Sequence, residues 1–168
     1  CRAPRPTGSA PRINTDQMGF VGYSMGGYAA FHAVKSLPEV NASVSIAGTP
    51  CFYQRWKDVL LECSTYLRWV EALKKVEQET ELRSAFILEM DPYQQMIDDF
   101  PTPLLMICGD VDPVAPKKYL LDLYQQINEA HQPDPGDLKL SVYDGIDHQL
   151  TLAMAEETVD WLGEVLNR

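Results

Sequence analysis

The feature that most constrains the fold is a short apolar run that turns into a helix through a glycine-rich segment. Residues 18–23 (MGFVGY) have strand character, and residues 26–36 have the apolar spacing of a helix. Between them the sequence is GYSMG, a G-x-S-x-G pattern centred on Ser24. A serine at a sharp strand-to-helix turn is strained and exposed, and glycines two positions away avoid a clash. The pattern therefore predicts that Ser24 is a nucleophile beside the free N–H groups of a helix N-terminus.

The rest of the chain alternates between strand-like and helix-like segments. Residues 104–108 (LLMIC) form a continuous apolar run, which is typical of a strand buried on both faces. Further strands are predicted over 42–47 and 138–143, and further helices over 117–130 and 150–166. This alternation predicts an α/β fold with a mostly parallel sheet that is flanked by helices.

Two stretches depart from this rhythm. Residues 52–100 contain two predicted helices, over 54–63 and 65–90, which we interpret as a helical cap insertion between two strands. The aromatic residues of this insertion are assigned to its own helix core. Residues 1–14 are rich in proline and arginine and are expected to be a disordered or linker-like segment, so the domain portion spans 15–168.

Composition excludes several classes of protein. The chain has 168 residues with 14 Lys and Arg against 24 Asp and Glu, a net charge of −10, which disfavours binding to nucleic acids and to anionic membrane surfaces. No apolar run approaches the roughly 18 residues that span a bilayer. The four cysteines form no CxxC pair and have no zinc-ligand spacing with the histidines, so we expect no metal. Their sparseness favours a reducing compartment such as the cytoplasm, with Cys108 as a buried apolar residue.

A nucleophilic serine needs a base, and the chain has three histidines. His32 lies in the middle of a predicted helix, and His131 ends one. His148 lies in a loop after the last predicted strand, and functional groups of open α/β sheets collect at the carboxyl ends of strands. His148 is therefore the best candidate for the base by position.

The acid that orients the base has several candidates. Asp110 and Asp112 both follow the apolar strand 104–108, with Asp112 deeper in the loop. Asp144 and Asp147 are neighbours of the histidine in sequence, but local neighbours rarely orient an imidazole from the correct side. The strand-end positions therefore favour Asp110 or Asp112.

Three segments together resemble the C-terminal part of an α/β-hydrolase, more narrowly the dienelactone-hydrolase and prolyl-oligopeptidase-like esterase branch. They are residues 18–27 (MGFVGYSMGG), 103–116 (PLLMICGDVDPVAP) and 145–148 (GIDH). The second segment resembles the family's apolar strand followed by G-x-x-D-x-x-x-P, and this alignment places the acid on Asp112. The order Ser24, Asp112, His148 is the order found in α/β-hydrolases.

The resemblance implies hydrolysis of small-molecule esters through an acyl-serine intermediate, without a cofactor or a metal. Ser24 would attack the carbonyl, His148 would act as base, Asp112 would orient it, and the Met25 N–H would contribute to the oxyanion hole. Dienelactone hydrolases proper use a cysteine nucleophile, so the serine favours an esterase. Two alternatives stay open: a serine peptidase of the prolyl-oligopeptidase type, and a non-catalytic or inactive truncated fragment of such a hydrolase.

Complete members of this family carry several strands before the nucleophile, whereas 23 residues precede Ser24. We therefore expect a partial α/β-hydrolase fold whose N-terminal strands are missing. The strand over 18–23 would then be an open, apolar edge of the sheet, and such edges pair with other chains. We expect this edge to be covered by a complementary N-terminal segment or by a second copy in a dimer.

Overall fold

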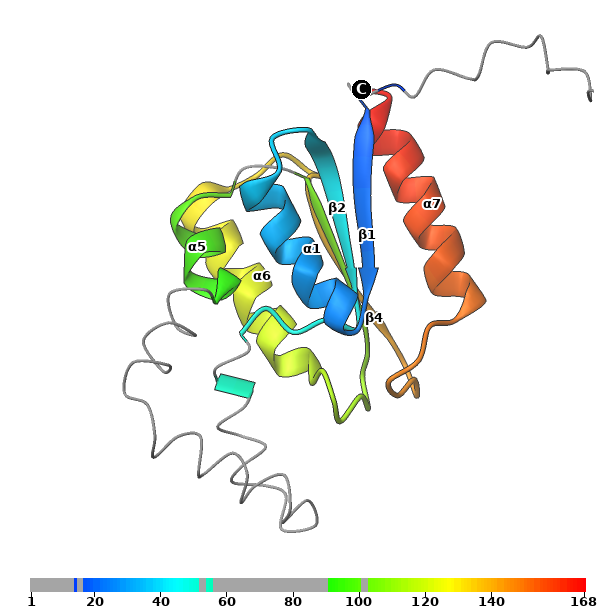
Figure 1. The fold of residues 1–168 in the computed structure, drawn as a ribbon. Helices are drawn as coiled ribbons and strands as arrows, with labels where there is room; N and C mark the ends of the chain where they lie inside the picture. The colour runs from blue at the N-terminus through cyan, green and yellow to red at the C-terminus, as the bar shows by residue number, and fades with distance from the viewer. Residues whose placement is uncertain (1–13, 15–16, 52–53, 56–90, 101–102) are drawn as a thin grey trace, which may run out of the picture.

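The computed structural model describes residues 14, 17–51, 54–55, 91–100 and 103–168, and these residues form strands and helices in alternation (Figure 1). In chain order the elements are β1 (Met18–Tyr23), α1 (Met25–Ser36), β2 (Val40–Ile46), α5 (Pro92–Asp98), β3 (Leu104–Gly109), α6 (Lys117–His131), β4 (Leu138–Tyr143) and α7 (Leu152–Leu166). The predicted α/β class is confirmed. The last helix begins two residues later than expected, because the Thr151 side chain caps it by accepting the Met154 N–H at 3.3 Å.

The four strands form one parallel sheet in the order β1-β2-β3-β4. In the register of the sheet, Tyr23 at the end of β1 lies opposite Ile46 of β2, and Ile46 lies opposite Ile107 of β3. The carboxyl ends of the strands are therefore aligned, and the loops that follow them meet at one edge. In the part of the chain that the structure describes, β1 pairs with β2 alone and so ends the sheet, as expected.

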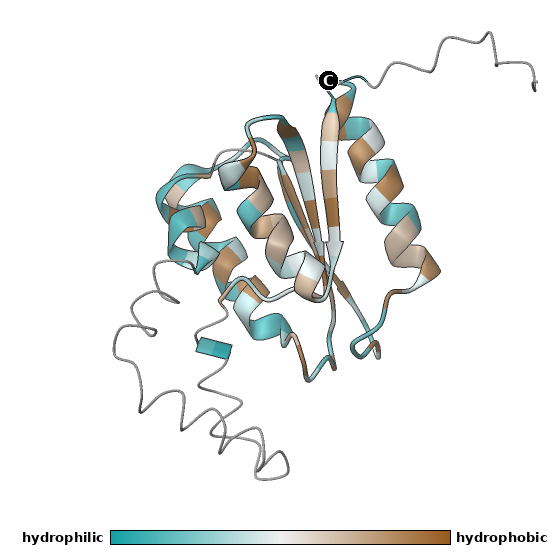
Figure 2. Cartoon of the chain, in the orientation of Figure 1, coloured by the Kyte–Doolittle hydropathy of each residue, from teal (hydrophilic) through white to brown (hydrophobic). Residues whose placement is uncertain are grey.

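Helices cover both faces of the sheet, with α1, α5 and α6 on one side and α7 on the other (Figure 1). The central strand β3 is buried along its whole length. Its alternate residues Leu104, Met106 and Cys108 pack toward α1 and α6, whereas Leu105 and Ile107 pack toward α7. The apolar bands on the strands and on the inner sides of the helices show this two-sided core (Figure 2). It explains why β3 is apolar without alternation.

Cys108 illustrates the consequence of this burial for reactivity. Its side chain is fully buried, as predicted. Burial raises the pKa of the Cys108 thiol to about 11, because the charged thiolate would lose its hydration. Cys108 is therefore a structural residue at the end of β3.

The helices predicted over 54–63 and 65–90 lie outside the described residues, apart from positions 54 and 55, and so does the segment 1–13. At the C-terminal end of the expected insertion the structure describes α5, which begins after Asp91 with a proline in its first turn. Met96 of α5 is fully buried in the same core cluster as α1 and α6. This end of the insertion is thus part of the domain core.

None of the helices in the described ranges is long and apolar enough to cross a membrane.

Candidate active site

The turn between β1 and α1 has the strained geometry that the sequence predicts. Ser24 has φ 56° and ψ −115°, a left-handed φ that is uncommon for a residue other than glycine. The Ser24 N–H donates to the Ile46 carbonyl at 2.8 Å, and the Ser24 carbonyl accepts from the Tyr28 N–H at 3.1 Å. These bonds fix the turn to β2 and to the first turn of α1, so the strain is held by its surroundings.

The two glycines that flank Ser24 in the motif differ in the space around them. A Cβ on Gly22 would lie 1.8 Å from the Gly26 carbonyl oxygen, so glycine is required there. A Cβ on Gly26 would meet nothing within 4 Å, so a methyl group has room there, in contrast to Gly22. The second close approach is at Gly27, where a Cβ would lie 2.8 Å from the Cα of Gly48. The start of α1 thus packs directly on the loop after β2.

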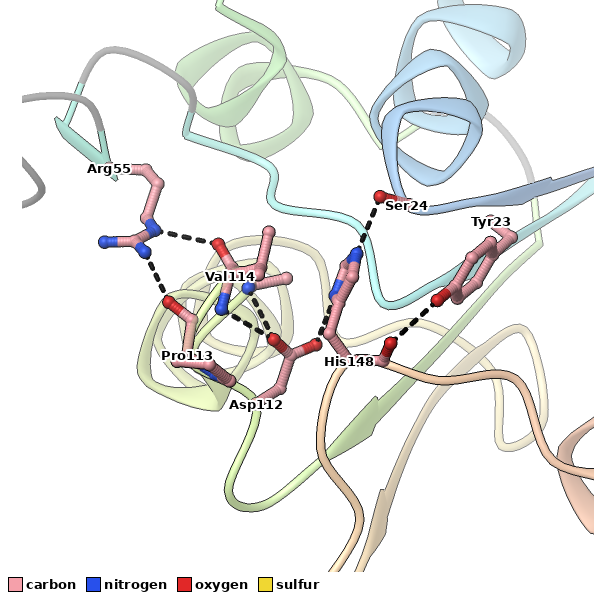
Figure 3. A network of polar contacts seen from close by, with 8 residues as sticks. Tyr23, Ser24, Arg55, Asp112, Pro113, Val114 and His148 are labelled. Carbon is pink, nitrogen blue, oxygen red and sulfur yellow. Dashed lines mark hydrogen bonds and ion pairs between the residues drawn. The ribbon is translucent and has the colours of Figure 1, made fainter. Parts of the chain in front are cut away.

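The hydroxyl of Ser24 lies at one end of a chain of hydrogen bonds (Figure 3). The distance from Ser24 Oγ to His148 Nε2 is 2.7 Å, and the distance from His148 Nδ1 to Asp112 Oδ2 is 2.8 Å. The Asp112 side chain is fully buried and that of His148 is 21% exposed. The three residues that the sequence selected are therefore in contact, although they come from the ends of three different strands.

The Asp112 carboxylate is held by its own loop. Its Oδ1 accepts the N–H groups of Val114 at 2.7 Å and Ala115 at 2.9 Å, which leaves Oδ2 for His148. Asp110, the other candidate, accepts the Gly145 N–H at 2.6 Å and lies 4.0 Å from Lys117 Nζ. Of the two aspartates, Asp112 contacts the imidazole, and Asp110 connects its own loop to the loop that carries His148.

The other two histidines have different surroundings. The ring of His32 packs edge-on against Tyr28 within α1. Burial lowers the pKa of His32, and the negative charge of Asp91 opposes this shift in part. The His131 Nε2 lies 2.7 Å from the Ile97 carbonyl oxygen at the α5–α6 contact. Among the described residues, neither ring contacts Ser24.

Two further residues at the site were not singled out from the sequence. Arg55 donates its Nε–H to the Val114 carbonyl at 2.8 Å and an Nη2–H to the Pro113 carbonyl, so it holds the loop of Asp112 from outside (Figure 3). Tyr23 contacts His148 with its hydroxyl and its ring. The position of Tyr23 next to Ser24 was a usable signal, whereas nothing in the sequence connects Arg55 to a loop almost sixty residues away.

Within the described ranges, no group of three or more His, Cys, Asp or Glu side chains could hold a metal ion.

A parallel sheet with helices on both faces and a strained serine at the carboxyl end of a strand defines the α/β-hydrolase fold. The model of the prolyl oligopeptidase family matches residues 7–168. The chain therefore belongs to that family, and the resemblance inferred from its three motifs is confirmed.

Solved structures show the same fold. TT1662 from Thermus thermophilus superposes with a TM-score of 0.66 at 15% identity, over 90% of this chain and 56% of its own. Acetyl xylan esterase 1 from Thermoanaerobacterium sp. JW/SL YS485 has a TM-score of 0.66 at 19% identity, over 93% of this chain and 48% of its own. The acylaminoacyl peptidase of Pyrococcus horikoshii has a TM-score of 0.67 at 16% identity, over 94% of this chain and 25% of its own.

Among curated proteins, the chain is similar to the pimeloyl-acyl-carrier-protein methyl ester esterase of Xylella fastidiosa strain 9a5c. The two are 38% identical over 63 residues, which is 36% of this chain and 24% of the esterase. This similarity thus covers about a quarter of that relative, and the chain covers about half of the first two structures above.

Proposed function

We propose that the protein is a serine hydrolase that cleaves carboxylic esters through an acyl-serine intermediate. The observation that carries this proposal is the continuous hydrogen-bonded series Ser24–His148–Asp112 at the carboxyl edge of the sheet. Family membership and the fold shared with esterases support a serine hydrolase of the α/β-hydrolase class. The ester substrate and the roles of the three residues are our inference from the geometry.

In the first half-reaction, Ser24 Oγ attacks the ester carbonyl while His148 Nε2 takes the hydroxyl proton. The carbonyl C–O π bond opens to an oxyanion, and the N–H of Met25 at the start of α1 donates to it. The oxyanion then collapses and the ester C–O bond breaks. His148 returns the proton to the leaving alkoxide, which departs as an alcohol.

In the second half-reaction, a water molecule replaces the alcohol and the same groups act again. His148 takes a proton from the water, the hydroxide attacks the acyl-serine, and the proton returns to Ser24 Oγ as the carboxylic acid leaves. Throughout, the buried Asp112 accepts the Nδ1–H of His148, which keeps Nε2 free for the reacting proton and stabilises the imidazolium.

The test is hydrolysis of short p-nitrophenyl esters by the wild type and by Ser24→Ala. We expect the variant to lose at least about 10³-fold in kcat, because no other group in the series can form the acyl intermediate. Ser36→Ala is the matched control, since Ser36 is exposed at the other end of α1. Hydrolysis that is unchanged in Ser24→Ala would contradict the proposal.

A serine peptidase is the second candidate, and membership of the prolyl oligopeptidase family favours it. The same three side chains would serve an amide substrate, so the two candidates differ in the leaving group that must be protonated. Parallel assays on acyl p-nitrophenyl esters and on the corresponding acyl p-nitroanilides distinguish them. Turnover of the anilides at rates comparable to the esters would favour the peptidase.

The alternative of a non-catalytic fragment is tested by a fluorophosphonate probe. Labelling of a longer version of the protein, without labelling of the 168-residue chain, would identify the chain as inactive on its own. In that case, additional strands of the longer protein would pair with the edge strand β1.

A dimer that covers this edge is a separate possibility. It would appear as twice the monomer mass in analytical ultracentrifugation.

A further inference from the structure

Tyr23 makes two separate contacts with the residue that we propose as the base. Its hydroxyl donates to the His148 carbonyl oxygen at 2.9 Å. Its ring stacks on the imidazole, with 5.5 Å between the ring centroids and 30° between the planes. In Figure 3 the imidazole of His148 lies between Asp112 and Ser24, while Tyr23 reaches across to the backbone of the same residue. One side chain therefore restrains both the backbone and the ring of His148.

The loop that carries His148 is held from two directions. Its first half is attached to the loop after β3, because Val111 N–H donates to the Ile146 carbonyl at 3.2 Å and Asp110 accepts the Gly145 N–H. These bonds place the loop relative to the acid. The Tyr23 hydroxyl instead ties His148 to the end of β1, the strand that presents Ser24. The residue next to Ser24 in the sequence thus contacts the residue that we propose as the base.

We propose that Tyr23 is a positioning residue that keeps the imidazole of His148 within hydrogen-bond distance of Ser24. This inference rests on the proposed function of the site. In the mechanism, Nε2 must face Ser24 Oγ and then the leaving oxygen, so rotation of the ring or a shift of its backbone removes the productive geometry. A displacement of about 1 Å costs up to about 10²-fold in rate.

The kinetic test compares Tyr23→Phe and Tyr23→Ala with the wild type. The phenylalanine keeps the stacked ring and loses the hydroxyl, so we expect kcat to fall by about 3-fold; the alanine loses both contacts and should fall by about 10- to 100-fold. KM should change little in either variant. Tyr23 is 39% exposed, so these changes leave the core intact. Tyr93→Phe is the matched control, because it removes a hydroxyl contact with Asp122 between α5 and α6.

A different outcome would overturn the inference. If Tyr23 only formed part of the surface that binds substrate, Tyr23→Ala would raise KM and leave kcat unchanged. If it acted only on stability, kcat of the folded variants would equal that of the wild type and only the urea midpoint would fall.

A second readout separates failure of this inference from failure of the proposed function. Proton NMR of the imidazole follows the Nδ1–H of His148, whose hydrogen bond to Asp112 shifts its signal downfield in a protein that need not turn over any substrate. We expect this signal to broaden or disappear in Tyr23→Ala and to persist in Tyr23→Phe. An unchanged signal in Tyr23→Ala overturns the positioning role. Absence of the signal from the wild type contradicts the hydrogen bond between His148 and Asp112, and with it the proposed function on which the inference rests. A wild type that shows the signal but hydrolyses no ester contradicts the proposed function alone.

Discussion

The two oxygens of Asp112 have separate tasks. Oδ1 accepts two backbone N–H groups of its own loop, which fixes the orientation of the carboxylate, and Oδ2 faces His148. Asp110, two residues earlier, reaches a backbone N–H of the neighbouring loop. Two aspartates with the same charge and nearly the same sequence position therefore differ in what they can do for the imidazole.

This difference gives a paired prediction. Asp112→Asn would replace the acceptor for the Nδ1–H with an amide that can present a donor, so we expect kcat on p-nitrophenyl esters to fall by about 10³- to 10⁴-fold. Asp110→Asn keeps an oxygen acceptor for Gly145, and we expect a loss of less than about 10-fold. Steady-state kinetics of the two variants check this order. A larger loss in Asp110→Asn would transfer the acid role to Asp110.

The two glycines that flank Ser24 should differ in their tolerance of alanine. In Gly22→Ala the new methyl group would overlap the Gly26 carbonyl, and we expect a loss of at least about 3 kcal/mol in the free energy of unfolding. Gly26→Ala is the matched change with open space around it, and its stability should stay within about 1 kcal/mol of the wild type, on the stabilising side because alanine favours a helix. Urea unfolding measures both. Equal losses of unfolding free energy in the two variants would contradict the difference in space between Gly22 and Gly26.

At the scale of elements, the site depends on three loops that follow parallel strands. Ser24, Asp112 and the loop of His148 follow β1, β3 and β4, and β2 lies between the first two. The loops after β3 and β4 are packed tightly, because a Cβ on Gly109 would lie 2.0 Å from the Ile146 carbonyl oxygen. Asp112 and the loop of His148 thus follow neighbouring strands, and Ser24 follows a strand that lies on the other side of β2.

Because of His32 in α1, we expect the free energy of unfolding to depend on pH. Burial beside Tyr28 lowers the pKa of His32 from its ordinary value of 6.5, with Asp91 opposing in part. The unfolded chain therefore binds a proton at a higher pH than the folded chain does. The contribution of His32 to the free energy of unfolding is therefore fully present above about pH 6.5. It decreases as the pH falls from 6.5 to the lowered pKa of His32, and below that pKa it does not change further.

We expect His32→Gln to remove this decrease. The measurement is the free energy of unfolding in urea at about pH 7.5 and about pH 5.5, where the difference between the two values should be smaller in the variant than in the wild type. A His32→Gln variant that keeps the full pH dependence of the wild type would exclude His32 as the source of this dependence.

Glu157 titrates in a separate, more acidic range of pH. Burial tends to raise the pKa of Glu157, but hydrogen bonds from Lys139, Ser141 and Tyr143 together lower it below 4.5.

The sequence predicted the parts of this arrangement that have a local cause. Ser24 was identified because its turn has a five-residue pattern, and β3 because a strand buried on both faces is continuously apolar. His148 and the Asp110–Asp112 pair were identified from their positions after strands. The place of Tyr23 beside Ser24 indicates that it lies near the site, but its partner His148 and the partners of Arg55 could not be predicted in this way, because each contact joins residues that lie far apart in the chain. They depend on the strand order, which no single segment encodes.

For the 168-residue chain as a whole, with the ester hydrolysis that we propose, the net charge of −10 leads us to expect a preference among esters. A substrate that carries a carboxylate is repelled by the field of the protein, so kcat/KM should be lower for a p-nitrophenyl ester with a terminal carboxylate than for p-nitrophenyl acetate, by roughly 2- to 10-fold at low salt. The gap should narrow as salt is raised toward about 0.5 M, because the ions screen the field. A ratio that does not change with salt would show that local contacts, and not the net charge, determine the preference.

Whether His148 activates Ser24 as a nucleophile is tested by the site and the rate of labelling by a fluorophosphonate probe. Such a probe reacts with a serine that a neighbouring base activates, and peptide mapping by mass spectrometry locates the adduct. We predict one adduct, on Ser24, and labelling at least about 10²-fold slower in His148→Gln, which lacks the proposed base. An adduct on another serine, or equal labelling rates in the wild type and His148→Gln, would contradict it.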